Sequence, residues 1–167
     1  MTAIDTATAS SVAKSLGLTE AARQSSVDIL TTTLAATFAL YTKTRKFHWN
    51  VTGPQFMDLH KLFESQYDAL DEAMDEVAER VRQLGGVAIG TLEELQEHSY
   101  LQEAPGVNPN ALAMVAELLA DHETVIRHLR ADVETTTHNN DVGTADFLTG
   151  LLAGHEKTAW FLRSYLE

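Results

Sequence analysis

A run of histidine and acidic residues in the first half of the chain could bind metal ions. Its members follow one another at spacings of 4, 4, 3, 4 and 4, so they share one face of a helix; they are His60, Glu64, Asp68, Asp71, Asp75 and Glu79. Imidazole and carboxylate together suit iron, zinc and manganese better than calcium or magnesium. Like charges at this spacing repel, and no Lys or Arg stands among them. The alternative is a solvated acidic face that binds nothing.

His48 adds a second imidazole twelve residues before His60, and the turn signal at residues 50–54 can bring the two together. His60 and Asp75 are 15 residues apart, which is about 22 Å along one helix. One ion cannot reach both within a single chain. Two antiparallel copies of this helix, related by a two-fold axis, would place residues 60–64 beside residues 75–79 of the partner. The spacing therefore predicts two equivalent sites at a dimer interface.

The elements that must position these residues are helices. Apolar residues recur at spacings of three and four over residues 20–49, from the turn at 50–54 to Leu84, from Pro109 to the turn at 138–141, and from there towards the C-terminus. A short helix is expected over residues 92–98, and no β alternation is present. The pattern predicts an all-α four-helix bundle with a short helix in the second-to-third connection. Residues 1–18 are expected to form a flexible tail and residues 19–167 the bundle.

Composition excludes several classes of function. The chain has 167 residues, no Cys and a formal charge of −12. Without Cys there is no disulfide scaffold, thiolate zinc site or cysteine nucleophile. The negative charge disfavours contacts with phosphate backbones and anionic lipid. No Glu stands three residues before a histidine, which argues against a di-iron centre of Glu-x-x-His type inside one chain. With no signal or membrane segment, the expected location is the cytoplasm, with nucleoid association as the alternative.

Two stretches resemble the signatures of a known family. His48-Trp49-Asn50-Val51-Thr52-Gly53, continuing to Leu59–Glu64, resembles the first signature of the Dps mini-ferritins, and Met74–Arg80 followed by Leu84-Gly85 resembles the second. The resemblance implies a ferritin-like bundle that assembles into a dodecameric hollow shell. It also implies ferroxidase centres shared between two-fold-related subunits, which agrees with the distance argument.

The resemblance assigns roles by position. His48, His60 and Glu64 would come from one subunit, and Asp75 and Glu79 from the other. The family often has Asp where this chain has Glu64. Trp49 would lie beside the site, either to intercept oxidising equivalents or simply as a packed interface aromatic.

Two further acidic residues are candidates for the iron-entry pores that the family has at its three-fold axes. Asp146 matches the pore position near the start of the last helix, and Asp141 is the weaker candidate. Asp146 could instead stabilise the dipole of the first helical turn.

The chemistry implied by the resemblance is oxidation of Fe(II) to Fe(III), preferably with hydrogen peroxide, and storage of the ferric mineral, which protects against oxidative damage. Zinc is a possible competing ion, because affinity alone favours Zn²⁺ over Fe²⁺. DNA binding is expected to be weak or absent, since residues 1–18 carry one Lys and one Asp rather than a basic run. The alternative function is a nucleoid-associated, DNA-protecting structural shell with a weak or zinc-occupied metal site.

The other histidines have mainly structural interpretations. His122 lies on the apolar face of the third helix and is expected in the core, while His98 and His138 are expected at the surface or in turns. His155 occupies a seam position of the last helix, and an auxiliary metal contact there stays open.

Overall fold

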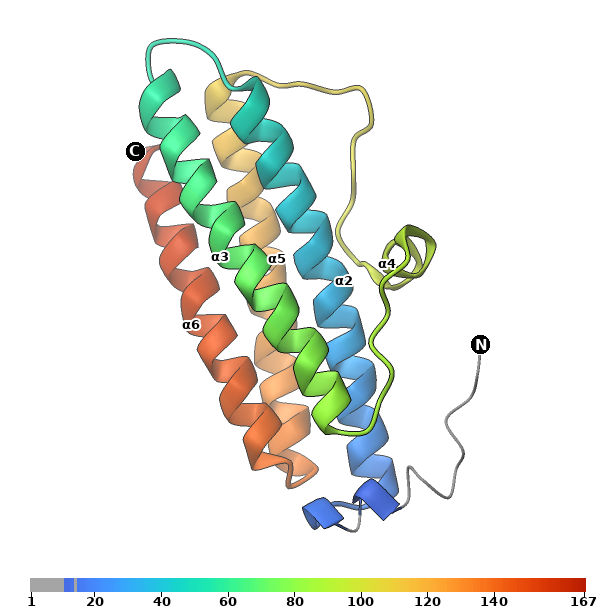
Figure 1. Ribbon diagram of the computed structural model, residues 1–167. Helices are drawn as coiled ribbons and strands as arrows, with labels where there is room; N and C mark the ends of the chain where they lie inside the picture. The colour runs from blue at the N-terminus through green and yellow to red at the C-terminus, as the bar shows by residue number, and fades with distance from the viewer. Residues whose placement is uncertain (1–10, 14) are drawn as a thin grey trace.

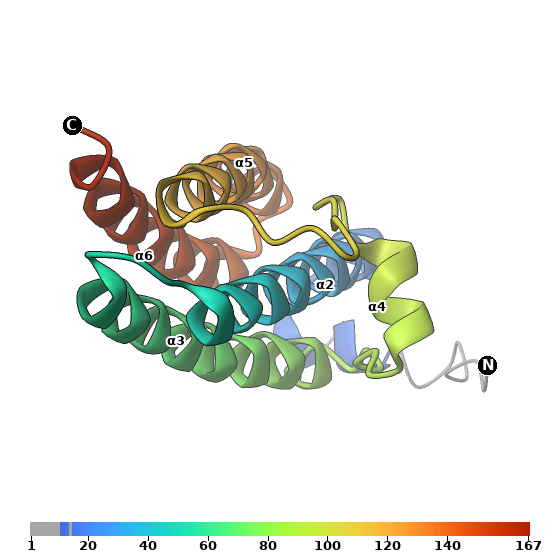
Figure 2. The ribbon, with the colours of Figure 1, turned by 90° about the horizontal axis from the view of Figure 1, so that it is seen from above.

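The computed structural model describes residues 11–13 and 15–167. Its main elements are the helices α2 (Glu20–Asn50), α3 (Phe56–Gln83), α4 (Leu92–His98), α5 (Ala111–His138) and α6 (Val142–Ser164). Helices α2 and α3 form one antiparallel hairpin and α5 and α6 another, and the long connection between them returns along the bundle, so that α3 and α5 run in the same direction (Figures 1 and 2). The described residues contain no strand. The predicted all-α four-helix bundle, with a short helix in its middle connection, is confirmed.

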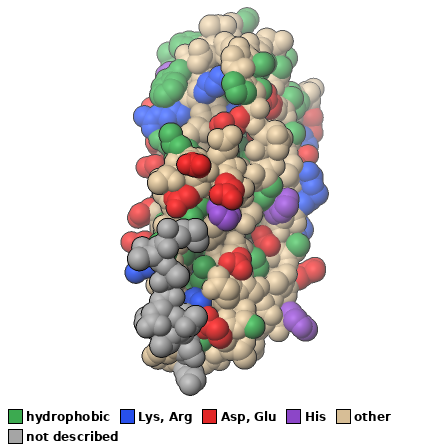
Figure 3. Space-filling model, turned by 90° about the vertical axis from the view of Figure 1, so that its right-hand side faces the viewer, with side chains coloured by type: hydrophobic (Ala, Val, Ile, Leu, Met, Phe, Trp, Pro, Cys, Tyr) green, Lys and Arg blue, Asp and Glu red, His purple; other side chains and the backbone are tan. Residues whose placement is uncertain are grey.

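The apolar seams of the long helices form one continuous core. Seam residues of α3 such as Leu59, Phe63, Val77 and Val81 are fully buried, and they pack with α2, α5 and α6. Polar and charged residues cover the outside. Figure 3 shows the face that carries α4 and the long connection, where acidic side chains are spread over the described surface among scattered Lys and Arg side chains. Within the part of the chain that is described, no helix is long and apolar enough to cross a membrane.

Side-chain caps define where α2, α4, α5 and α6 begin. The Thr19 hydroxyl accepts from the backbone N–H of Ala22 at 3.1 Å and caps α2, as the sequence predicts. The third long helix differs from its prediction, because it begins at Ala111 rather than at Pro109. Asn110 is its N-cap, and its side chain accepts from the backbone of the first turn. A cap with a hydrogen-bonding oxygen decides the start here, and Pro109 only precedes it.

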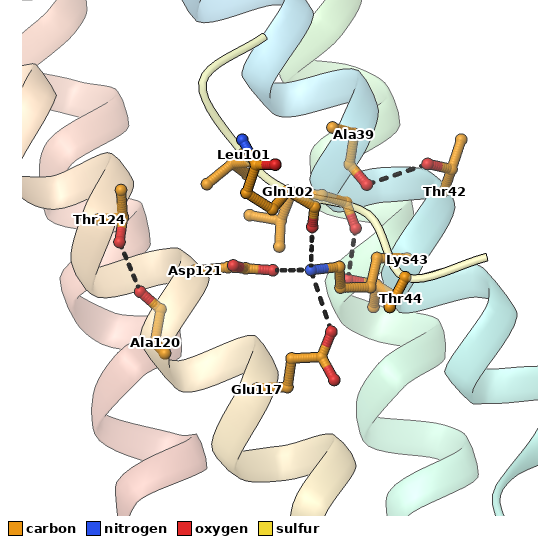
Figure 4. Close-up of polar contacts among 12 residues, drawn as sticks. Ala39, Thr42, Lys43, Thr44, Leu101, Gln102, Glu117, Ala120, Asp121 and Thr124 are labelled. Atoms are coloured by element: carbon orange, nitrogen blue, oxygen red, sulfur yellow. Dashed lines mark hydrogen bonds and ion pairs between the residues drawn. The ribbon is translucent and has the colours of Figure 1, made fainter. Parts of the chain in front are cut away.

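A buried lysine fastens the long connection to the bundle. Lys43 of α2 donates to Asp121 of α5 at 2.7 Å and to the carbonyl of Gln102 in the connection at 2.9 Å, and it pairs with Glu117 at 3.1 Å (Figure 4). Its side chain is only 9% exposed. A cation buried to this extent needs such partners, because an unpaired buried charge costs several kcal/mol. The ion cluster therefore holds two helices and the connection in register.

Part of the expected N-terminal tail is helical. Residues 11–13 and 15–16 are helical, and Ala13 is only 2% exposed. A Cβ built on Gly85, whose φ is +73°, would lie 3.1 Å from the side chain of Val12, so this stretch passes close to the end of α3. This differs from the expected loose tail. The rest of that expectation, for residues 1–10 and 14, falls outside the described residues.

Candidate metal centre

His48 and His60 lie face to face where α2 ends and α3 begins. Their rings are stacked, with centroids 3.7 Å apart and an angle of 19° between the planes. His48 Nδ1 lies 2.8 Å from the backbone carbonyl oxygen of His60, and His60 Nδ1 lies 2.9 Å from that of His48. A carbonyl oxygen can only accept, so both Nδ1 atoms carry the proton and donate. In the neutral form of each imidazole, Nε2 is then the unprotonated nitrogen, which is the atom that can bind a metal ion.

The connection between α2 and α3 brings these two residues together. The N–H of Val51 donates to the carbonyl of Phe47 at 2.8 Å, and the N–H of Phe56 donates to Gly53 at 3.0 Å. Gly53 has a φ of +109°, which L side chains rarely adopt. Val51 is buried and anchors the turn in the core. The chain therefore reverses within a few residues and places position 60 beside position 48.

Aromatic and cationic side chains surround the histidine pair. Tyr67 meets His48 edge-on with ring centroids 5.2 Å apart, and Arg45 lies over the rings of Tyr67 and Trp49 at 5.1 and 5.6 Å. Burial and then the neighbouring carboxylates, Glu64 first, raise the pKa of Tyr67. Trp49 is 66% exposed within one chain. Tyr67 and Arg45 were not among the predicted site residues, although Tyr67 stands one helical turn from the seam residues Phe63 and Leu70.

The structure keeps Asp75 and Glu79 away from the histidines within one chain. Glu64, Asp75 and Glu79 are exposed, and α3 is unbroken, so the separation of about 22 Å between His60 and Asp75 stands. Among the described residues, no group of three or more His, Asp or Glu side chains could hold one ion. One chain thus contains two separate sets of donors, a histidine pair at one end of the face and a carboxylate pair at the other.

The two pore candidates have different surroundings. Asp141 is 4% exposed and caps α6: it accepts from the N–H of Thr144 at 3.1 Å and from the Ser26 hydroxyl at 2.7 Å, and it faces Arg80 at 3.5 Å. Burial alone would raise the pKa of Asp141, but the hydrogen bonds from Thr144 and Ser26 hold it below its ordinary value. Asp146 is exposed and lies beyond the first turn of α6, so the helix-dipole interpretation of Asp146 is wrong.

Of the remaining histidines, His128 of α5 is exposed and stacks on Tyr100 with ring centroids 3.8 Å apart, and the other four fall into two groups. His98 and His138 are exposed at the ends of α4 and α5, as predicted. His122 is buried, which confirms its core position, and it contacts His155 of α6, which is also buried.

Comparisons with known proteins agree with this architecture. The sequence model of the ferritin-like domain family matches residues 27–167. An uncharacterized low temperature-induced protein of Nostoc sp. is 48% identical over 153 residues, which span 91% of this chain and 86% of that protein. DNA protection during starvation protein 2 of Bacillus anthracis is 36% identical over 84% of this chain and 96% of its own.

A solved structure extends the likeness to three dimensions. The crystal structure of a Dps protein from Bacillus brevis superposes with a TM-score of 0.85 and 35% identity, and it covers 88% of this chain and 98% of that one. From helix order, signature residues and these matches together, the chain belongs to the Dps family within the ferritin-like proteins.

Proposed function

We propose that this protein oxidises Fe(II) with hydrogen peroxide at centres formed between two subunits, and that it stores the ferric product. The reciprocal hydrogen bonding of His48 and His60 carries the proposal, because it fixes two imidazoles with free Nε2 atoms at one end of a carboxylate-rich helix face. His48, His60 and Glu64 would bind iron from one subunit, and Asp75 and Glu79 from its two-fold partner.

The donor set suits the reaction. Nitrogen ligands hold Fe(II), while hard carboxylates such as Glu64, Asp75 and Glu79 favour Fe(III) and so promote electron loss. Two Fe(II) ions each give one electron to one peroxide molecule, and with two protons the products are two Fe(III) and two waters. Because the peroxide takes both electrons at one site, hydroxyl radical is not released. Tyr67, which meets the His48 ring edge-on, and Trp49, which follows His48 in the chain, are the residues proposed to intercept a stray oxidising equivalent.

Storage requires an enclosed space, and the family likeness supports a dodecameric shell. In such a shell Asp146 is the candidate for guiding iron through the three-fold pores, because its carboxylate is exposed and no hydrogen bond or ion pair within the described chain occupies it. Asp141 is engaged by Ser26, Thr144 and Arg80, so its proposed role is to hold the start of α6 rather than to bind passing iron. Zn²⁺ would compete with Fe(II) for the histidines.

The second candidate function, protection of DNA by physical coverage, is supported by the name of the Bacillus anthracis relative. Charge argues against strong DNA binding here. Each chain carries −12, and the face in Figure 3 shows no large basic patch on its described surface. We expect a cytoplasmic protein that binds DNA weakly or not at all at physiological salt. A salt-sensitive mobility shift at low protein concentration would contradict this.

Anaerobic loading with Fe(II), followed by one peroxide for every two iron ions, tests the chemistry by the absorbance of Fe(III). The variant His48→Ala/His60→Ala should oxidise iron far more slowly than wild type. The matched control His98→Ala/His138→Ala removes two exposed histidines and should behave as wild type. Equal rates of Fe(II) oxidation in all three proteins would show that the assignment of His48 and His60 to the site is wrong.

Mixed assemblies test whether the centre is shared between subunits. His48→Ala/His60→Ala chains are unfolded and refolded together with Asp75→Asn/Glu79→Gln chains. Each parent assembly has no intact centre, but a mixed dimer has one centre with all its ligands and one with none. Random mixing should therefore restore about a quarter of wild-type activity. An absence of rescue in correctly assembled mixtures would mean that the centre lies within one chain.

A further inference from the structure

A second set of polar side chains lies inside the bundle, away from the proposed ferroxidase centre. Gln66 of α3, His122 of α5 and His155 of α6 are 6%, 2% and 7% exposed, and all three line one cavity of about 340 Å³. Glu72 and Glu76 of α3 also line this cavity.

The cavity lies on a different flank of α3 from the acidic run. Its α3 residues occupy positions 66, 69, 70, 72, 73 and 76, whereas the run occupies 60, 64, 68, 71, 75 and 79. On the α6 side the wall includes Gly150 and Gly154, and a Cβ added to either would meet nothing within 4 Å. These glycines are therefore not required for close helix packing; they leave space beside the histidines.

The two imidazoles point the same nitrogen at each other. His122 Nδ1 and His155 Nδ1 are 2.9 Å apart, and the ring centroids are 5.0 Å apart. Two nitrogens bound to one zinc ion at about 2.0–2.1 Å lie about 3.0–3.4 Å from each other, depending on the angle at the metal. A movement of a few tenths of an ångström would thus convert the contact into a shared pair of ligands.

Other polar atoms around the cavity have no partner in the described chain. His122 Nε2 and both amide atoms of Gln66 are buried without a hydrogen bond. A buried polar atom without a partner destabilises the fold, and folded proteins contain few of them. Metal on the Nδ1 atoms would place the His122 proton on Nε2, which then needs an acceptor. The amide oxygen of Gln66 is an unpartnered acceptor on the same cavity wall.

We propose that His122 and His155 form a second metal site, within each subunit, for a single divalent ion that prefers imidazole, such as Zn²⁺. His122 and His155 supply two nitrogen ligands, and water in the cavity completes the coordination. Gln66 is a positioning residue that orients the His122 ring. With two imidazoles and no buried carboxylate, the site favours zinc and copper over Fe(III). It would therefore bind an ion that the shell's iron chemistry does not consume.

Co²⁺ and Zn²⁺ titrations of the assembled protein test the proposal. In the His48→Ala/His60→Ala background the proposed iron centre lacks its imidazoles, so it contributes little binding. We expect one Co²⁺ per subunit with the visible absorption of a nitrogen-ligated ion, displaced by Zn²⁺. Adding His122→Leu/His155→Leu should abolish this binding, and adding Gln66→Leu should weaken it about 10–100-fold. Adding His138→Ala, which removes an exposed histidine from α5, the helix that carries His122, should leave Co²⁺ binding unchanged.

Two results would overturn the proposal. The first is no bound Co²⁺ or Zn²⁺ in the background protein, which would mean that the cavity holds water only. The second is binding that survives His122→Leu/His155→Leu. Size-exclusion chromatography and circular dichroism establish that each variant is assembled and helical. If the His122→Leu/His155→Leu variant does not fold, metal binding by the His48→Ala/His60→Ala protein still tests the proposal, because that protein has an unchanged cavity.

Discussion

Replacing Asp141 with Ala should destabilise the bundle strongly, although the residue lies in a short turn. The Asp141 carboxylate ties three segments together: it caps α6 through Thr144, accepts from Ser26 of α2 and faces Arg80 of α3. Loss of a helix N-cap costs about 1 kcal/mol. Ser26 is fully buried, so its hydroxyl would lose its partner at a further cost of about 1–3 kcal/mol. The Arg80 contact is long and part-exposed, and it adds little.

The expected loss in free energy of unfolding is therefore about 3 kcal/mol, which for a chain of this length lowers Tm by about 6–12 °C. The pH dependence has a definite sign. The folded-state pKa of Asp141 lies below its ordinary value, so its charged form stabilises the fold above that ordinary value. This stabilisation disappears as the pH falls through the folded-state pKa. The difference between wild type and Asp141→Ala should therefore stay constant from pH 7 to about pH 5 and shrink as the pH falls below the ordinary value of 3.8.

Differential scanning calorimetry at one fixed protomer concentration measures both effects, because assembly makes Tm depend on concentration. Asp146→Asn is the matched control: it removes an exposed carboxylate from the same helix and should change Tm by no more than the equivalent of about 0.5 kcal/mol. If Asp146 lines the pore, this variant slows iron uptake while it keeps its stability. A Tm for Asp141→Ala within about 2 °C of wild type would refute the reasoning about the turn.

Two other predictions concern packing and buried charge. Lys43→Met should cost about 2–4 kcal/mol in urea denaturation at pH 7.5, because it leaves Asp121 buried without its cation. Burial raises the pKa of Asp121 even with Lys43 present, so protonation of Asp121 at lower pH favours the folded state of the variant. The difference in unfolding free energy between wild type and Lys43→Met should therefore decrease towards about pH 5. A difference that grows on acidification would contradict this. Gly86→Ala should lower the free energy of unfolding by about 1–3 kcal/mol, because its Cβ would lie 2.8 Å from the Val81 side chain. Gly90→Ala is the control and should be neutral, because a Cβ there meets nothing within 4 Å. Equal thermal stability of the two variants would show that the side chains around residue 86 move aside at no cost.

Local signals in the sequence predict most of the helices. The seam from Leu59 to Leu84 and the cap at Thr19 give the ends of α2 and α3 closely, because periodicity and capping act within a few residues. The start of α5 was predicted two residues early, since Pro109 and Asn110 are both start signals and only the hydrogen-bonding side chain caps the helix.

The candidate site was only partly predictable. The pairing of His48 and His60 follows from the turn between them, but the exchange of backbone hydrogen bonds depends on the orientation of two helices and leaves no mark in the residue pattern. The burial of Gln66 and Lys43 could have been predicted, because each is a polar residue at the spacing of the apolar seam. Gln66 stands between Phe63 and Leu70, and Lys43 stands between Leu40 and Phe47. The contact of His122 with His155 could not be predicted from the residue pattern of α5 or of α6 alone, because it depends on how the two helices pack against each other.

The unbroken course of α3 has a consequence for when chemistry can begin. One rigid helix keeps His60 and Asp75 about 22 Å apart in every copy of the chain, so no motion short of unfolding brings them to one ion. If the centre is shared between subunits as proposed, a newly made subunit carries both halves of it and should not oxidise iron by itself. On the same proposal, assembly would control the reaction: iron and peroxide would meet a complete set of ligands only where a partner subunit, and with it an enclosed space for the product, is already present.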